Sequence, residues 1–300
     1  MTTRASLGDV EIAYEVDGPD DGVPMLLIMG LGTQLVGWPP EVIDGLVAEG
    51  FRVVRMDNRD IGLSTRTEGP PPTRAAVMSA FVHRRYARSD YVLSDMADDA
   101  RALLDHLGID AAHVVGVSMG GMIAQQLTID HPDRVLSLAS IMSNTGSRRR
   151  GSVSLRLLPS VAMSLTTPRP TDEDEAVRLG VEAFRLIAGP HFDVDEVTGM
   201  VRSAVQRSVN PLGAIRQLLA ILASPDRTAG LREIRVPTLV IHGLKDPLVV
   251  PSGGIATTKA VPGSRLLMFP DMAHDLPKPR RAEIVQAITT NARRAALVEH

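Results

Sequence analysis

The chain of 300 residues contains no cysteine. This absence excludes disulfide bonds, thiolate metal sites and a cysteine nucleophile, and it fits a cytoplasmic protein. Aromatic side chains make up only 3% of the residues, whereas 13 methionines supply flexible apolar filling for a core or a pocket. Basic and acidic residues nearly balance, at 32 and 35. Without a basic excess or a tail of like charge, we expect neither a nucleic-acid partner nor binding to a membrane surface.

The sequence also lacks a long apolar run. Its apolar stretches stay below the roughly 18 residues that a membrane-spanning helix needs. Residues 1–4 do not start like a secretory signal. We therefore expect cytoplasmic localisation without a membrane anchor. A hydrophobic content of 44% over 300 residues is ample for a sizeable core, so we predict one large α/β domain with room for an inserted subdomain.

The most informative stretch of the sequence runs from residue 112 to residue 121. Residues 112–117 are mostly Ala and Val, which predicts a short buried strand, and the apolar spacing after Gly120 predicts a helix. Between them stands Gly-x-Ser-x-Gly with Ser118 at its centre. A sharp strand-to-helix turn pushes such a hydroxyl clear of the sheet and places free N–H groups behind it. We therefore predict that Ser118 is a nucleophile rather than part of a glycine-rich core turn.

Strands and helices alternate along most of the chain, which predicts a doubly wound, mostly parallel sheet. The alternation breaks between residues 145 and 229, where the pattern is helical with no strand. We predict a helical cap at 145–229, inserted into a core domain made of residues 1–144 and 230–300. The predicted strands span residues 9–17, 25–29, 51–56, 112–117, 135–141, 237–241 and 264–269, and the predicted helices include 41–49, 94–107, 252–260 and a last one from about 280.

Three connections have less regular patterns. Gly30-Leu31-Gly32 could be mistaken for a dinucleotide-binding loop, but Leu35 stands where the third glycine belongs, so we reject a nucleotide site. Residues 57–64 carry two aspartates and an arginine, and we interpret them as a buried turn held by Asp–Arg pairing rather than as catalytic residues. Residues 66–90 are expected to be irregular.

A serine hydroxyl is a poor nucleophile at neutral pH and needs a base, which an acid in turn holds in one tautomer. Asp246 and His274 each follow their own predicted strand, in the order Ser, Asp, His that a parallel sheet of this kind imposes. After the strand that ends at Ile141 the chain has Ser143 and Asn144, not a carboxylate, so Asp246 is the predicted acid. The remaining histidines show no metal-ligand spacing, so we expect no metal site.

At this point the chain resembles the α/β-hydrolase superfamily over almost its whole length, and within it the branch that contains aclacinomycin methylesterase. The motifs that carry the resemblance are Met29-Gly30-Leu31-Gly32, Gly37-Trp38-Pro39, the 57–64 loop, Gly116-Val117-Ser118-Met119-Gly120 and Val236 to Ile241. It implies Ser118 as nucleophile, His274 as base and Asp246 as its orienting acid. It also implies an oxyanion hole formed by the backbone N–H groups of Leu31 and Met119. Met29 departs from the superfamily, in which a histidine commonly precedes this glycine.

We therefore predict a cofactor-free serine hydrolase that cleaves carboxylic esters of small, mostly uncharged molecules through an acyl-enzyme. Perhydrolysis, acyl transfer, amide cleavage and C–C bond hydrolysis on the same triad stay open, as does a non-enzymatic small-molecule receptor. The oligomeric state, including a homo-oligomer, also stays open. Apolar cap residues are expected to supply part of the substrate pocket: Leu155, Leu157, Met163, Leu165, Phe184, Leu186 and Ile187.

Overall fold

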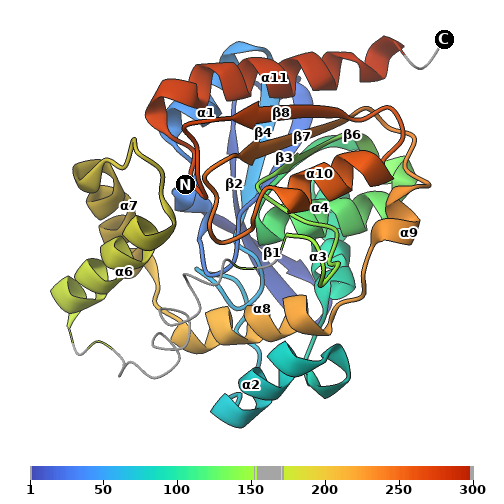
Figure 1. Cartoon of the computed structure of the whole chain (residues 1–300). Helices are drawn as coiled ribbons and strands as arrows, with labels where there is room; N and C mark the ends of the chain where they lie inside the picture. Colours follow the sequence, from blue (N-terminus) through green and yellow to red (C-terminus); the bar gives the residue numbers. More distant parts are fainter. Residues whose placement is uncertain (1, 152, 154–169, 171, 298–300) are drawn as a thin grey trace.

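The computed structural model describes residues 2–151, 153, 170 and 172–297, and its centre is one eight-stranded sheet (Figure 1). The strands lie in the order β1-β2-β4-β3-β5-β6-β7-β8. β2 pairs antiparallel with both β1 and β4, and all other neighbours pair in parallel. Their bounds are β1 Thr3–Leu7, β2 Val10–Asp17, β3 Val23–Ile28, β4 Phe51–Met56, β5 Ala112–Val117, β6 Val135–Ile141, β7 Thr238–Gly243 and β8 Arg265–Phe269.

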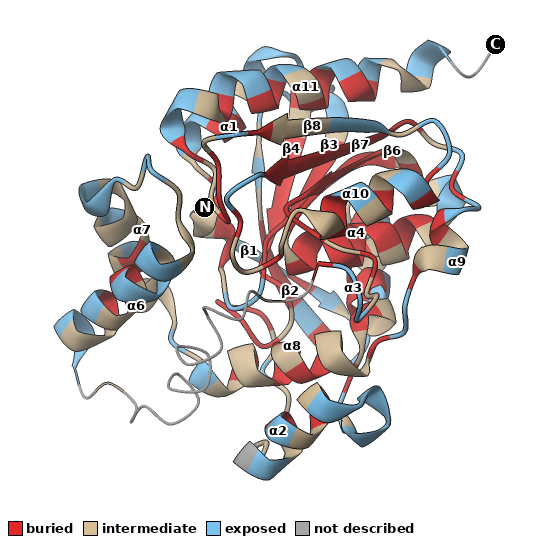
Figure 2. Ribbon diagram, viewed as in Figure 1, coloured by how far each residue is buried: buried red, intermediate tan, exposed pale blue. Residues whose placement is uncertain are grey.

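Helices cover both faces of the sheet, and each face has its own apolar core (Figure 1). On one face α1 (Pro40–Ala48) packs against α11 (Arg281–Arg293). On the other face lie α3 (Leu93–His106), α4 (Met119–Asp130) and α10 (Ser252–Ala260). The central parallel strands are buried on both faces, so they read as continuous apolar runs (Figure 2). This arrangement confirms the predicted doubly wound, mostly parallel sheet.

Between β6 and β7 the described chain forms four helices and no strand. They are α6 (Glu173–Ile187), α7 (Val194–Arg207), α8 (Pro211–Ala223) and α9 (Thr228–Leu231). α6 and α7 pack on each other through Val177, Val181 and Val201, and most of their other residues are half-buried or exposed (Figure 2). Both are strongly amphipathic, and only one narrow apolar stripe of each is covered.

Several local predictions need correction. Residues 66–90 are not irregular throughout, because α2 (Arg74–Val82) and the short 3₁₀ helix η2 (Arg84–Tyr86) lie within them. β1 was not predicted, because its five residues include only two apolar side chains and only Ala5 is buried. The helix predicted from residue 94 starts at Leu93, and the Asp95 carboxylate accepts the Val92 N–H at 2.7 Å. Other short 3₁₀ helices are η1 (Leu35–Gly37), η3 (Pro132–Arg134), η5 (Lys278–Arg280) and η6 (Ala295–Leu297).

Candidate active site

Ser118 lies on the turn between β5 and α4, where the sequence predicts it. Its backbone has φ +55° and ψ −119°, in the left-handed half of conformational space that L residues rarely adopt. The turn is tight because α4 begins directly at Met119, and a Cβ on Gly120 would lie 2.0 Å from the Ile28 carbonyl oxygen. The Ser118 N–H donates to the Ile141 carbonyl at 2.8 Å, which ties the turn to β6. The strained backbone and the obligatory glycine together present the hydroxyl beyond the sheet edge.

The loops after β7 and β8 bring Asp246 and His274 to this serine. His274 Nε2 lies 2.9 Å from Ser118 Oγ, and His274 Nδ1 lies 2.7 Å from Asp246 Oδ2. His274 is 8% exposed and Asp246 3% exposed, so the chain of hydrogen bonds is nearly shielded from solvent. The three side chains that the sequence singles out are thus in mutual contact, although residues 118 and 274 are 156 positions apart.

Asp246 is held in place by its own loop. Its Oδ1 accepts the N–H groups of Leu248 and Val249 at 2.9 and 2.8 Å, which leaves Oδ2 for the histidine. Burial alone would raise the pKa of this carboxyl. The charge of His274, hydrogen bonds from His242 and His274 and the Val249 N–H outweigh burial, so the pKa of Asp246 lies below its ordinary value. The acid therefore stays ionised and keeps the His274 Nδ1–H pointed toward it.

A buried second histidine, His242, also faces the acid. Its Nε2 lies 2.7 Å from the Val249 carbonyl oxygen and 3.4 Å from Asp246 Oδ2. Since a carbonyl only accepts, Nε2 carries the proton and His242 donates. Sequence analysis did not single out His242, because a histidine four residues before the predicted acid belongs to no recognisable motif.

The His274 loop is in turn attached to the α6–α7 hairpin. The His274 N–H donates to the Ile187 carbonyl at 3.0 Å, and the Gly189 N–H donates to Asp275 Oδ2 at 2.9 Å. Asp271 does not compete for His274, because it pairs with Arg280 and His191. These two partners lower the pKa of Asp271 to about 2. His274 is therefore positioned by both the core and the inserted helices.

The two predicted oxyanion donors flank the serine. Met119 is the first residue of α4, and the first N–H groups of a helix have no acceptor within it. The loop after β3 runs against the serine, since a Cβ on Gly30 would lie 3.2 Å from Ser118 Cβ. In this loop the Gly32 N–H donates to Gln217 Oε1 at 2.9 Å, whereas the Leu31 N–H makes no hydrogen bond with any described residue. The arrangement is compatible with donation from Leu31 and Met119, whose role remains a prediction.

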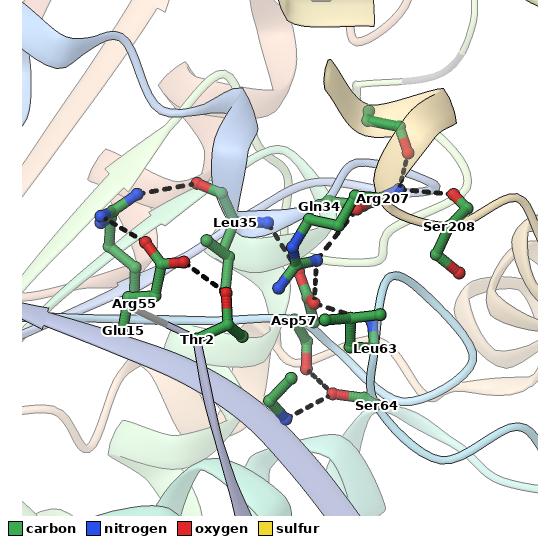
Figure 3. A network of polar contacts seen from close by, with 12 residues as sticks. Thr2, Glu15, Gln34, Leu35, Arg55, Asp57, Leu63, Ser64, Arg207 and Ser208 are labelled. Carbon is green, nitrogen blue, oxygen red and sulfur yellow. Dashed lines mark hydrogen bonds and ion pairs between the residues drawn. The ribbon is translucent and has the colours of Figure 1, made fainter. Parts of the chain in front are cut away.

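The 57–64 loop is the buried turn that the sequence predicts, but its ion pairs join other partners. Asp57 does not pair within the loop; Arg207 Nη1, at the end of α7, donates to its Oδ2 at 2.5 Å (Figure 3). Arg59 binds Asp99 of α3, with both nitrogen–oxygen distances at 2.6 Å. Sequence analysis missed Arg207 because its partner lies 150 residues away and no local pattern marks the pair.

An apolar cavity of about 250 Å³ lies between the loop after β3 and the inserted helices. Phe184, one of the expected pocket residues, lines it, whereas Leu186 is 52% exposed. Leu155, Leu157, Met163 and Leu165 lie outside the described residues. The lining comprises Gly32, Thr33, Gln34, Gly37, Ile61, Gly62, Ala176, Gly180, Phe184, Met200, Val201, Ala204, Val205, Ser208, Val209, Asn210, Pro211 and Ala214.

A groove of about 320 Å³ runs along β8 and α11 and contains none of the predicted site residues. Across the described residues, no three His, Asp or Glu side chains are arranged to hold a metal ion. None of the described helices is both long and apolar enough to cross a bilayer.

Comparison with known proteins agrees with this architecture. Residues 23–169 match the family described as alpha/beta hydrolase fold. The chain is 29% identical to rhodomycin D methylesterase DnrP of Streptomyces peucetius, over 99% of this chain and 100% of that protein. It is 30% identical to RutD of Variovorax paradoxus, which is named for carbamate hydrolysis, over 79% of each chain. Among solved structures, the enol-lactonase from Burkholderia xenovorans LB400 superposes with a TM-score of 0.72 at 22% identity, covering 98% of this chain and 100% of that one.

Proposed function

The chain belongs to the α/β-hydrolase family, and we propose that it is a serine esterase that cleaves carboxylic esters through an acyl-enzyme. One observation carries the proposal: Ser118 Oγ, both ring nitrogens of His274 and Asp246 Oδ2 form one line of hydrogen bonds at 2.9 and 2.7 Å. At one end of the line, Ser118 has a strained backbone with positive φ, and its hydroxyl lies beyond the sheet edge. Methylester hydrolysis in the name of a full-length relative supports the same class of reaction.

In the acylation step, Ser118 Oγ attacks the ester carbonyl carbon while His274 Nε2 takes the hydroxyl proton. Asp246 stays charged and stabilises the imidazolium that forms, because its lowered pKa keeps it from accepting the proton. The C–O bond to the alcohol then breaks, and His274 returns the proton to the leaving oxygen. This step leaves the acyl group on Ser118 as an ester.

In the deacylation step, a water molecule attacks the same carbonyl carbon and His274 again takes a proton. The bond to Ser118 Oγ breaks, the serine recovers its proton from His274, and the carboxylic acid leaves. In both steps negative charge develops on the former carbonyl oxygen. We propose that the N–H groups of Leu31 and Met119 stabilise that charge, since backbone donors fixed in advance need no reorganisation during the reaction.

Two features of the structure support small, mostly uncharged substrates. The cavity beside the loop after β3 is lined mainly by aliphatic and small side chains; it includes Gly32, next to Leu31, but none of Ser118, Asp246 and His274. Of the cations near it, Arg207 is bound to Asp57, and Arg66 donates to Ser208 Oγ at 3.1 Å. We further propose that residues 145–229 act as the cap of a core made of 1–144 and 230–300, because α7 and α8 both contact the loop after β3.

A series of p-nitrophenyl esters of increasing acyl length tests the proposal, with wild type and Ser118→Ala compared at equal concentration. We expect turnover by wild type, a loss of about 10³-fold or more in the variant and cooperative melting of both proteins. An acyl series that includes a dicarboxylate monoester should show lower kcat/KM for the charged ester than for its uncharged analogue. Retention of most activity in Ser118→Ala would refute the assignment of the nucleophile.

A further inference from the structure

The loop after β3, residues 29–35, has few bonds of its own and depends on five distant side chains, one of which, Arg55 of β4, donates to the Leu35 carbonyl at 3.5 Å. Asn58 Nδ2 donates to the Met29 carbonyl at 2.9 Å, and Asp57 Oδ1 accepts the Leu35 N–H at 2.8 Å. Both belong to the turn after β4. The remaining two side chains come from the inserted helices: Gln217 of α8 accepts the Gly32 N–H, and Arg207 of α7 donates to Gln34 Oε1. The proposed oxyanion donor, the Leu31 N–H, therefore lies between backbone groups that are fixed from outside the loop.

The contact with α7 is the most extensive of these and is shown in Figure 3. Arg207 Nη1 donates to Asp57 Oδ2 at 2.5 Å and to Gln34 Oε1 at 2.9 Å. Gln34 Nε2 in turn donates to the carbonyls of Ala204 and Ser208, both at 2.7 Å. The Gln34 side chain thus receives a hydrogen bond from α7 and returns two to the carboxyl-terminal end of that helix. The Ala204 carbonyl also accepts the Ser208 N–H at 3.0 Å, whereas the Ser208 carbonyl lies beyond the last helical bond.

These contacts are buried, so they act in a region of low dielectric. The Asp57 side chain is completely inaccessible, Arg207 is 12% exposed, and Gln34 is 5% exposed. The turn after β4 encloses the pair: Gly62 has φ +61°, and a Cβ there would lie 2.1 Å from Asp57 Oδ2. Another arginine of α7, Arg202, pairs with Asp174 of α6 at the surface, where the two side chains are 43% and 84% exposed. The two arginines offer a matched contrast within one helix.

We propose that Arg207 and Gln34 are positioning residues, through which α7 holds the loop after β3 so that the Leu31 N–H points at the oxyanion. The inference rests on the proposed esterase function. It makes the inserted helices part of the catalytic arrangement, in addition to any role as a cover for substrate. Asp57 is the fixed point on the core side, since it accepts from Leu35 and Arg207 at once.

The test compares Arg207→Met, Arg207→Lys and the control Arg202→Met, with kcat and KM for one short p-nitrophenyl ester. Because a small misplacement of a catalytic group can cost about 10²-fold, we expect Arg207→Met to lower kcat about 10- to 100-fold. KM should change less than about threefold, since ground-state binding of so small an ester does not use these contacts. Arg207→Lys keeps the charge for Asp57 and should recover part of kcat. Arg202→Met should match wild type.

Amide hydrogen exchange provides a readout that does not depend on turnover. Exchange of residues 30–37 should become faster in Arg207→Met than in Arg202→Met, while exchange of β5 and β6 stays unchanged. If Arg207→Met fails to fold, Gln34→Met leaves the Arg207–Asp57 pair intact and should show the same two effects in weaker form. Unchanged kcat and unchanged local exchange in a folded variant would overturn the inference. A wild type that hydrolyses no ester would instead refute the proposed function, and the exchange experiment would still decide whether α7 holds the loop.

Discussion

Asp246 and Asp57 occupy comparable places in the fold and differ in the side chains that face Oδ2. Each follows a buried parallel strand, β7 or β4, each side chain is fully inaccessible, and each uses Oδ1 to accept backbone N–H groups. Opposite Oδ2 lies His274 in the first case and Arg207 in the second. A histidine exchanges its proton near neutral pH, whereas an arginine keeps it. On the proposed mechanism, a similar carboxylate environment serves proton transfer in one region and positioning in the other.

The largest losses in kcat should come from the residues linked to Asp246, namely His274 and Ser118. Ser118→Ala and His274→Ala should each reduce kcat by about 10³-fold or more, and the double variant should lose little beyond either single one, because such residues act as a unit. The measurement is ester turnover by purified proteins whose melting temperatures are near wild type. Losses that multiply in the double variant would mean that Ser118 and His274 act independently, contrary to the hydrogen bond between them.

Asp246→Asn and Asp57→Asn test the comparison directly. Asp246→Asn should lower kcat by about 10³- to 10⁴-fold, since an amide favours the wrong histidine tautomer. Asp57→Asn should lower kcat only about tenfold, because it loosens a loop whose displaced donor still lies near the oxyanion. Equal losses in kcat from two folded variants would remove the distinction between proton transfer and positioning.

The two proposed oxyanion donors, Leu31 of the loop and Met119 of α4, should respond to changes of backbone but not of side chain. Leu31→Pro removes an N–H group, and loss of one oxyanion donor typically lowers kcat about 10²- to 10³-fold. Met119→Leu keeps the backbone and most of the packing, so kcat should stay within about tenfold. Binding of a substrate analogue and an unchanged melting temperature serve as controls for the proline. Normal kcat in a folded Leu31→Pro variant would transfer the role to another donor, with Gly32 the next residue to test.

The smallest predicted effect concerns stability at acid pH. The pKa of Asp246 is lowered in the folded protein, so its contribution to stability is complete above the ordinary aspartate pKa of about 3.9 and is lost as pH falls through the lower folded value. The difference in Tm between wild type and Asp246→Asn should therefore shrink as the pH falls from 5 towards 3. Thermal melts at half-unit intervals of pH measure it. A difference that grows on acidification would contradict the sign of the pKa shift.

Local patterns in the sequence predicted the features that short segments determine. The buried runs of β4 and β6 are predicted to the residue, and the turn at Ser118 follows from two glycines and a strand-to-helix change of period. Asp246 and His274 were found because each comes directly after a strand of a parallel sheet. Their order after Ser118 was enough to predict that the three side chains meet at one edge of the sheet.

Contacts between distant segments could not be predicted in this way. Arg207 looks like any basic residue at the end of an amphipathic helix, and only the packing of α7 on the core reveals Asp57 as its partner. α2 was missed because its apolar residues do not form a stripe on one face. Sequence analysis therefore located the groups that do the proposed chemistry, whereas the groups that hold them in place required the fold.

Covalent labelling with a fluorophosphonate tests the central claim most directly, because the reagent reacts with an activated serine whatever the natural substrate is. After incubation at neutral pH, peptide mass spectrometry should find one adduct, on Ser118, in wild type. The adduct should form far more slowly in His274→Ala, which lacks the base. Labelling at another serine, or an equal rate in His274→Ala, would contradict the assignment of Ser118, His274 and Asp246 as one catalytic unit.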